Sequence, residues 1–293
     1  YTILMKINIL KELDLMDIYE NKGYLNSEFK LFHLCDTNLT SFNFHYHEFD
    51  KIIIFLKGDV TYMIEGKNYK LKPYDIVIVN HNHIHKPNIN INIPYERIII
   101  YVSPNFIKAY KTDNYDLSLC FQKAKAEHSN VLRINSLATS KLFEITNKLE
   151  DSLVKKSYAY ELYNKILFLE FMINLNKAAI NNELEYIKTK YNKKVNTIIE
   201  YINSNLDNDL SLDSLSKKFF ISKYHMIRQF KAETGVTLGK FINNKRLLLA
   251  RDLILEDLPV TEVCYKCGFK DYSTFSRRFK EMFHVSPSKF KFD

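Results

Sequence analysis

The chain has 293 residues, of which 46% are hydrophobic and 26% are charged, and its formal net charge is +8. This length suits two globular domains, and no run of about 18 apolar residues is present that could span a bilayer, so we expect no membrane partner. The N-terminus does not match a signal peptide, and the cysteines at 35, 120, 264 and 267 are too scattered for a disulfide scaffold, so we expect reduced thiols and a cytoplasmic protein.

The first predicted elements are short strands. Apolar residues alternate with polar ones, as at Phe42, Phe44 and Tyr46, or form short apolar runs, as from Ile52 to Leu56. Turn signals such as Glu65-Gly66-Lys67-Asn68 separate these segments. The predicted strands cover residues 42–47, 52–56, 60–64, 69–71, 76–79 and 97–102. Many short strands at this spacing are typical of a β-sandwich or a small β-barrel.

A set of residues in this region resembles the two half-motifs of a cupin sensor domain. The set comprises His45, His47, Asp50, Gly58, the Pro73-Tyr74-Asp75 turn and His85. The resemblance implies a cupin-like effector-binding β-barrel, which we assign to residues 1–135. Tyr74 stands where the second cupin turn usually has glycine. Because a positive φ costs more for tyrosine than for glycine, we predict a type I turn at this position.

Two interpretations of the histidines stay open. His45 and His47 share one face of a strand, so with Tyr62 and His85 they can line a polar pocket for an organic effector. The same spacing, with Asp50 as the acid, suits a metal site built from His45, His47, Asp50 and His85. We favour the organic effector and predict neither a metal nor another cofactor, because such spacing alone is a weak signal for a metal.

Beyond Pro104 the apolar pattern changes to a helical period. One predicted helical face carries Leu142, Ile145, Leu149 and Leu153, and a second carries Leu162, Ile166, Leu169 and Ile173. We expect residues 136–180 to form a helical connector that packs on the strand domain, contacts a second copy of the chain, or does both. Residues 181–194 are rich in Asn and Lys and are predicted to be a linker, or else the charged end of a continuous helix.

Residues 195–293 contain a tandem repeat and most of the net charge. Phe230, Lys231, Val236, Lys240 and Phe241 recur 49 positions later as Phe279, Lys280, Val285, Lys289 and Phe290. From residue 190 onward there are 19 Lys and Arg residues against 12 Asp and Glu residues, whereas residues 1–189 contain 23 against 22. A small basic domain is typical of proteins that bind nucleic acid, although it would also suit an anionic membrane surface.

Each copy of the repeat is predicted to be a helix-turn-helix unit. Ser222 caps the second helix of the first copy and Asp271 that of the second copy, while Met226, Phe230, Phe275 and Phe279 face inward. The outward residues are Lys223, Tyr224, Ile227, Arg228, Tyr272, Ser273, Thr274, Arg277 and Arg278. A linking helix from Leu238 to Glu256 spans roughly 28 Å, close to the ~34 Å between successive major grooves of DNA. The two exposed helices can therefore enter adjacent grooves, and their side-chain types suit base edges and phosphates.

The run from Gly268 to Lys280, followed by Val285-Ser286-Pro287, resembles the signature of the AraC/XylS family of transcription regulators. The resemblance covers about Val195 to Phe292 and implies base contacts from Tyr224, Ile227 and Arg228 in the first copy, and from Tyr272, Ser273, Thr274 and Arg277 in the second. His284 replaces the usual glycine, so we expect a slightly less stable helix end.

Cys264 and Cys267 have the spacing of a metal or redox pair, but they match positions that the family fills with small core residues. No second pair accompanies them in the sequence. We interpret them as buried small side chains, because a lone pair of this kind is weak evidence for a site.

The predicted fold class is α+β multidomain. It consists of a cupin-like β-barrel with a helical connector, followed by an all-α domain, residues 195–293, with two helix-turn-helix units joined by a long helix. The family resemblance implies a sequence-specific DNA-binding transcription regulator, an activator controlled by a sugar or a related metabolite, without enzymatic activity. The expected partners are double-stranded DNA, the small-molecule effector, a second copy in a homodimer and RNA polymerase. The alternatives are a cupin metalloenzyme with an appended DNA-binding tail and a nucleoid-type binder without an effector.

Overall fold

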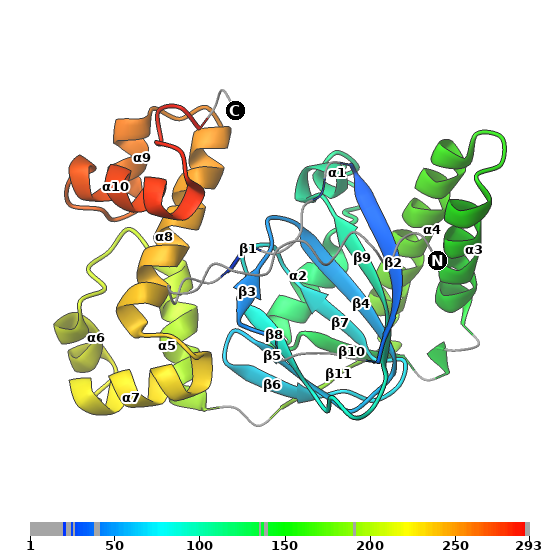
Figure 1. Cartoon of the computed structure of the whole chain (residues 1–293), viewed down its shortest axis with the longest axis horizontal. Coiled ribbons are helices and arrows are strands. Elements are labelled where there is room, and N and C mark those ends of the chain that lie inside the picture. Colours follow the sequence, from blue (N-terminus) through cyan, green and yellow to red (C-terminus); the bar gives the residue numbers. More distant parts are fainter. Residues whose placement is uncertain are drawn as a thin grey trace.

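The computed structural model describes residues 20–21, 25, 27–37, 42–134, 136–137, 140–189 and 192–290. Over these residues the chain forms an N-terminal domain of two β-sheets with flanking helices and a C-terminal domain of helices (Figure 1). No helix in these ranges is both long and apolar enough to cross a membrane. The predicted division into a strand-rich domain and a helical helix-turn-helix domain is confirmed.

The strands form a five-stranded and a six-stranded sheet. Their bounds are β1 Glu20–Asn21, β2 Phe29–Asp36, β3 His45–Tyr46, β4 Asp50–Lys57, β5 Val60–Ile64, β6 Lys67–Lys70, β7 Ile76–Val79, β8 His85–Ile89, β9 Tyr95–Val102, β10 Val131–Ile134 and β11 Leu184–Tyr186. The smaller sheet has the order β1-β3-β8-β5-β6 and the larger one the order β11-β10-β7-β4-β9-β2. Part of the segment predicted as a linker is thus strand β11, which pairs antiparallel with β10.

Alternation along the central strand β4 creates two separate cores. Ile52 and Ile54 pack against the helices on the outer face of the larger sheet. Ile53 and Phe55 point the other way, into the space between the two sheets, where they meet Tyr62 and Ile64 of β5. Because both faces of β4 are covered, its sequence is continuously apolar rather than alternating.

Tyr74 adopts a positive φ of 70°, so the predicted type I turn is wrong. The turn has the φ pattern of a type II turn, with Pro73 before Tyr74. Non-local contacts offset the cost of this conformation. The Tyr74 amide donates a hydrogen bond of 2.6 Å to the Phe55 carbonyl, and the Tyr74 ring packs edge-on against Phe143. The adjacent Asp75 carboxylate is buried and receives two hydrogen bonds from Arg133.

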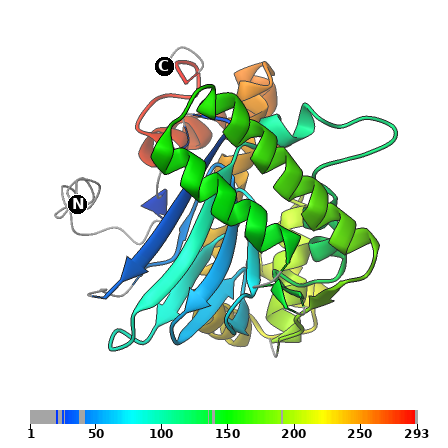
Figure 2. The same ribbon diagram turned by 90° about the vertical axis from the view of Figure 1, so that its right-hand side faces the viewer.

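In the described part of the N-terminal domain the helices are α1 Pro104–Lys108, α2 Leu119–Ala126, α3 Lys141–Lys155 and α4 Tyr160–Ile180. Figure 2 shows α3 and α4 lying across the larger sheet. The predicted inner face of α3 is buried through Leu142, Ile145 and Leu149. The predicted apolar stripe on α4 is instead largely exposed to solvent, as Leu162 and Ile166 show. Helix α4 packs on the domain through a different face that includes Leu167, Phe168 and Phe171.

The C-terminal domain consists of α5 Lys193–Ser204, α6 Leu212–Lys218, α7 Lys223–Thr234, α8 Leu238–Leu255, α9 Val260–Lys266 and α10 Tyr272–Phe283. Each helix-turn-helix copy has its own core, around Phe230 and Phe241 in the first and around Phe275 and Phe279 in the second. Helix α8 contributes residues to both cores and connects α7 of the first copy to α9 of the second (Figure 1).

Candidate nucleic-acid interface and effector site

Helix α7 presents a solvent-exposed surface in the first copy of the repeat. The Ser222 side chain accepts a hydrogen bond from the His225 amide, and Gly235 ends the helix at a φ of 77°, so local sequence fixes both ends. Met226 and Phe230 are buried. The remaining predicted residues are all exposed: Lys223, Tyr224, Ile227 and Arg228. The Arg228 guanidinium lies 5.8 Å from the centre of the Tyr224 ring, and Lys223 forms an ion pair with Asp213.

Helix α10 repeats this arrangement with a different surface. The Asp271 carboxylate accepts a hydrogen bond of 2.7 Å from the Thr274 amide and caps the helix. Ser273 and Arg277 are exposed, whereas Tyr272, Thr274 and Arg278 are half-buried. Tyr272 packs edge-on against Phe275, so part of its ring belongs to the core rather than to the exposed face.

The helix ends around α10 depend on specific backbone conformations. His284 takes a φ of 62° where the helix ends, the conformation that usually favours glycine. Gly268 has a φ of 77°, and a Cβ atom there would lie 2.3 Å from the Leu206 carbonyl oxygen and 2.8 Å from the Arg246 guanidinium. Arg246 in turn donates hydrogen bonds to the carbonyls of Leu206 and Asn208. The Cys264 and Cys267 side chains are buried in the core of this copy.

The four residues predicted to bind an effector lie together between the two sheets. His45, His47 and His85 have ring centroids 4.4 to 5.1 Å apart, and the ring of Tyr62 stacks on His85 at 6.0 Å. All four side chains are buried. The β-pairing of His45 with His85 brings these distant sequence positions together.

Hydrogen bonds to backbone carbonyls orient two of the imidazoles. His45 Nδ1 lies 2.8 Å from the Asn43 carbonyl oxygen, and His85 Nδ1 lies 2.8 Å from that of His83. These contacts require a proton on Nδ1, so in a neutral ring Nε2 keeps its lone pair. His85 Nε2 has no hydrogen-bond partner among the residues that the structure describes. Burial holds the pKa of His85 well below its usual range, so this imidazole is neutral.

Lys51 is a member of this cluster that the sequence interpretation missed. Its ammonium lies 3.5 Å from His47 Nε2 and 3.5 Å from the Tyr62 hydroxyl, and the side chain is buried. Burial, with a smaller contribution from Arg97, lowers the pKa of Lys51 to about 7. Lys51 directly precedes the apolar run of β4, and nothing in the sequence pattern distinguishes it from an ordinary strand residue.

The histidine cluster provides some, but not all, of the predicted metal ligands. The candidate ligand atoms of His45, His47 and His85 lie within 4.8 Å of one another, so the three imidazoles could hold a divalent ion. Asp50, the acid of the predicted metal set, instead accepts hydrogen bonds of 2.7 and 2.8 Å from the amide and ring of His81. In its protonated form, Lys51 beside His47 would also oppose a second positive charge.

Two family models match the chain. Residues 33–163 match the AraC-like ligand binding domain, and residues 215–291 match a helix-turn-helix domain that contains both α7 and α10. The chain belongs to the AraC family of transcription regulators. The predicted family is therefore confirmed, and with it the assignment as a DNA-binding regulator with a ligand-binding domain.

Individual relatives resemble this AraC-family chain at low identity. The HTH-type transcriptional activator RhaS of Escherichia coli O139:H28 is 23% identical over 246 residues, which are 83% of this chain and 85% of RhaS. The C-terminal domain of AraT from Geobacillus stearothermophilus is 26% identical, covers 34% of this chain and 84% of that chain, and has a TM-score of 0.33. ToxT of Vibrio cholerae strain SCE256, solved with a bound unsaturated fatty acid, is 16% identical, covers 92% and 97% of the two chains, and has a TM-score of 0.37.

The two domains of this AraC-family protein are in direct contact. Tyr46 and Ile84 of the N-terminal domain belong to the same apolar core as α5, α7 and α8. Polar contacts surround this core: Arg251 lies 2.7 Å from Glu48, and Lys245 lies 2.8 Å from Glu65. Sequence reasoning missed these residues. The available signal was that Lys245 and Arg251 fall on the inward face of α8, where charged side chains need a partner.

Proposed function

We propose that the protein activates transcription by sequence-specific binding to double-stranded DNA and that a small molecule bound in the N-terminal domain controls this binding. One observation carries the proposal. Two separately capped helices, α7 and α10, present Arg228 and Arg277 to solvent from the same basic domain. Arginine on an exposed helix suits the guanine edge in the major groove, and the exposed Lys223 suits phosphates.

The proposed effector site is the cluster of His45, His47, Tyr62 and His85. The four side chains are buried, and His85 Nε2 has no hydrogen-bond partner among the described residues, which is a cost that a polar ligand can offset. Lys51 adds a donor beside them. Hydroxyl groups of a sugar or a related metabolite are suitable partners for imidazole nitrogens and a phenol. Effector binding at this position would shift the balance between two arrangements of the domains.

The homodimer is also part of the proposal. The exposed residues Leu162, Ile166 and Ile173 recur along α4 at spacings of four and seven residues, which is the pattern of a helix that pairs with another helix. An apolar stripe of this length on a surface helix supports contact with a second copy of the chain. The dimer would place α7 and α10 of both copies on DNA, and RNA polymerase would be recruited to this site. DNA as the partner implies action in the cytoplasm.

Selection of bound duplexes from a random library tests the main proposal. The full chain should enrich one sequence with two elements about one helical turn apart, because α7 and α10 would enter successive major grooves. A nucleoid-type binder would enrich no sequence. A purified effector should change the affinity for the enriched duplex without binding DNA itself.

We also propose that the protein is not an enzyme and needs no metal. The alternative is a metalloenzyme built on the histidine cluster, and the convergence of His45, His47 and His85 is the observation that favours it. Metal analysis of the purified full chain distinguishes the two. A stoichiometric metal that is lost in His85→Gln and is required for a chemical activity would contradict the proposed sensor.

A further inference from the structure

Lys51 is a buried lysine at the proposed effector site. On β4 it shares a face with Ile53 and Phe55, which points into the space between the two sheets. Its ammonium nitrogen lies 3.5 Å from His47 Nε2 and 3.5 Å from the Tyr62 hydroxyl, which is long for a hydrogen bond. An imidazole lone pair and a phenol can accept from an ammonium, but neither supplies a negative charge to balance it.

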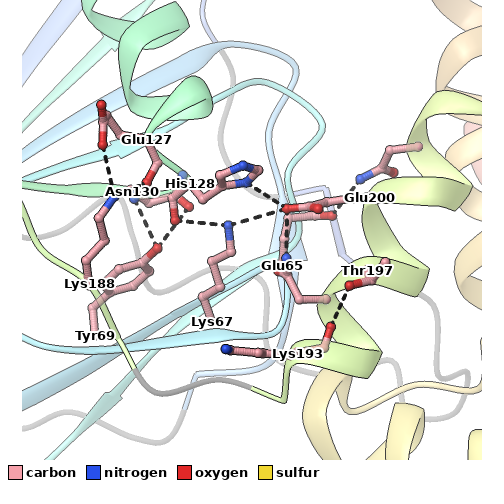
Figure 3. Close-up of polar contacts among 12 residues, drawn as sticks. Glu65, Lys67, Tyr69, Glu127, His128, Asn130, Lys188, Lys193, Thr197 and Glu200 are labelled. Atoms are coloured by element: carbon pink, nitrogen blue, oxygen red, sulfur yellow. Dashed lines mark hydrogen bonds and ion pairs between the residues drawn. The ribbon is translucent and has the colours of Figure 1, made fainter.

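The two other lysines that are buried in the described part of the chain do have such a charge nearby. Lys245 lies 2.8 Å from Glu65. Lys67 donates a hydrogen bond of 3.1 Å to the His128 carbonyl and lies 4.0 Å from Glu200, as Figure 3 shows. In both cases a carboxylate offsets part of the cost of removing the ammonium from water.

No carboxylate pairs with Lys51 among the residues that the structure describes. Asp50, its neighbour in sequence, lies on the other face of β4 and accepts hydrogen bonds from His81. Arg97 is a second cation of this region, and its own charge is paired with Asp36. Because Arg97 repels the ammonium, a positive charge on Lys51 lacks support from the protein. An anionic ligand beside Lys51 would provide that support.

His85 supplies a hydrogen-bond acceptor close to this cation. Its Nδ1 lies 2.8 Å from the His83 carbonyl oxygen and carries the proton, so Nε2 keeps a lone pair, which has no partner among the described residues. His47 lies near both groups, since its Nε2 is 3.5 Å from Lys51 Nζ and its ring centre is 4.9 Å from that of His85. A cation and an unpaired lone pair this close together suit a ligand with a negative charge and a hydroxyl group.

We propose that the effector is a small hydroxy acid, whose carboxylate accepts a hydrogen bond from Lys51 and whose hydroxyl donates one to His85 Nε2. This inference rests on the proposed effector site and narrows its ligand from sugars in general to sugar acids and shorter hydroxy acids. A neutral sugar would satisfy His85 but leave the buried ammonium without an opposite charge. A carboxylate without a hydroxyl would satisfy Lys51 but bring no donor to His85.

Calorimetric titration of the full chain without DNA, at fixed ionic strength, tests the ligand class. Glycerate carries both groups, propanoate lacks the hydroxyls, and glycerol lacks the charge; gluconate, hexanoate and glucose form the same comparison with six carbons. We expect glycerate or gluconate to bind once per chain. In that series the neutral compound should bind about tenfold more weakly and the simple carboxylate about fivefold more weakly, because each lacks one polar contact. If neither hydroxy acid binds, or if the neutral compound binds equally well, the proposal is overturned.

Lys51→Met locates the carboxylate of the bound hydroxy acid. Methionine has a similar length and no charge, and Lys51 has no carboxylate partner that the substitution would leave unpaired, so we expect the variant to fold, which circular dichroism verifies. It should lose the preference for the hydroxy acid over the neutral compound. Lys57→Met removes an exposed lysine from the same strand and should keep that preference. A folded Lys51→Met variant with the full preference would contradict the site.

DNA binding distinguishes this inference from the proposed function. The hydroxy acid that binds should change the affinity of the chain for the enriched duplex. If glucose changes that affinity and neither hydroxy acid does, the proposed regulator stands and the hydroxy-acid inference fails. If a hydroxy acid binds through Lys51 but the chain enriches no duplex, the ligand class stands and the proposed regulation fails.

Discussion

Lys245 of α8 and Glu65 of the turn between β5 and β6 form a buried ion pair, with Nζ 2.8 Å from Oε1. The two side chains are only 7% and 8% exposed, although they are 180 positions apart in the sequence. Burial acts to raise the pKa of Glu65, but Lys245 and His83 outweigh it and hold the pKa below its usual value. This ion pair therefore joins α8, the long helix of the DNA-binding domain, to the ligand-binding domain.

Loss of one partner of this pair should destabilise the protein strongly. In Lys245→Met, Glu65 remains buried without its cation, and we expect the free energy of unfolding to fall by about 3–5 kcal/mol. The midpoint of urea denaturation measures the change. Lys148→Met is the matched control, because Lys148 pairs with Glu144 on an exposed helix surface, and we expect no measurable shift. Equal shifts in the two variants would show that the domain contact contributes nothing to stability.

Two glycines should respond in opposite ways to alanine. Gly268 has a φ of 77°, and a Cβ atom there would meet the Leu206 carbonyl oxygen at 2.3 Å. Gly268→Ala should therefore lower the stability by more than the ~1–3 kcal/mol of a strained backbone conformation alone. Gly239 lies in α8 with nothing within 4 Å of an added Cβ atom, so Gly239→Ala should raise the stability by about 0.5–1 kcal/mol. Thermal denaturation of both variants checks the signs, and a loss in Gly239→Ala would contradict the argument.

Features fixed by neighbouring residues could be predicted from the sequence. Ser222 and Asp271 cap α7 and α10 as expected, because an N-cap depends on one side chain and the amide three residues later. The buried faces of α3, α7 and α10 also follow from helical spacing. His284 stands where the family usually has glycine and takes a φ of 62° at the end of α10.

Features that depend on distant residues could not be predicted. Tyr74 has a positive φ because the Phe55 carbonyl and the Phe143 ring compensate for it, and neither is near in the sequence. Lys51 looks like an ordinary strand residue until β4 is placed beside His47 and Tyr62. The exposed stripe on α4 has the same period as a buried one, so spacing alone did not show which face of α4 packs on the sheet.

The stability should depend on pH through His83. Burial lowers the pKa of His83 to about 4 in the folded protein, whereas an unfolded histidine has a pKa of about 6.5. Because the folded pKa is depressed, the stability from neutral His83 is present above pH ~6.5 and is lost as the pH falls toward 4. His83→Gln should therefore show a shallower decrease of the denaturation midpoint between pH 6.5 and 4 than the unchanged chain.

His33→Gln provides the control for this pH series. Burial lowers the pKa of His33, but its contacts with Glu150 and Glu96 outweigh burial and raise it above the usual value. The contribution of His33 to the stability of the folded protein is therefore fully present below pH ~6.5 and is lost only as the pH rises. The acid slope of His33→Gln between pH 5.5 and 4 should match that of the unchanged chain, in contrast to His83→Gln. Identical slopes in all three proteins would refute the assignment to His83.

Arg228 and Arg277 should determine DNA sequence preference. Each is exposed on its helix, and a guanidinium that contacts a guanine edge contributes about 1–3 kcal/mol of discrimination. Arg228→Ala and Arg277→Ala should each weaken binding to the selected duplex by that amount, while the affinity for random DNA falls less. Fluorescence anisotropy at fixed salt measures both affinities. Lys155→Ala on α3 removes an exposed positive charge far from α7 and α10 and should change neither. Full discrimination in both arginine variants would show that α7 and α10 do not read the sequence.

The exposed stripe on α4 should control the oligomeric state. Leu162 and Ile166 are 61% and 52% exposed, one helical turn apart, while the opposite face of α4 is buried in the domain. Two glutamates in the double variant Leu162→Glu/Ile166→Glu would place like charges in the proposed helix–helix contact. By light scattering we therefore expect a dimer for the unchanged chain and a monomer for the double variant. Ile91→Glu, at an equally exposed position in the turn between β8 and β9, should leave the mass unchanged. The double variant should still fold, because the contacts that pack α4 onto the sheet do not involve Leu162 or Ile166. If it keeps the mass of a dimer, the interface lies on another surface.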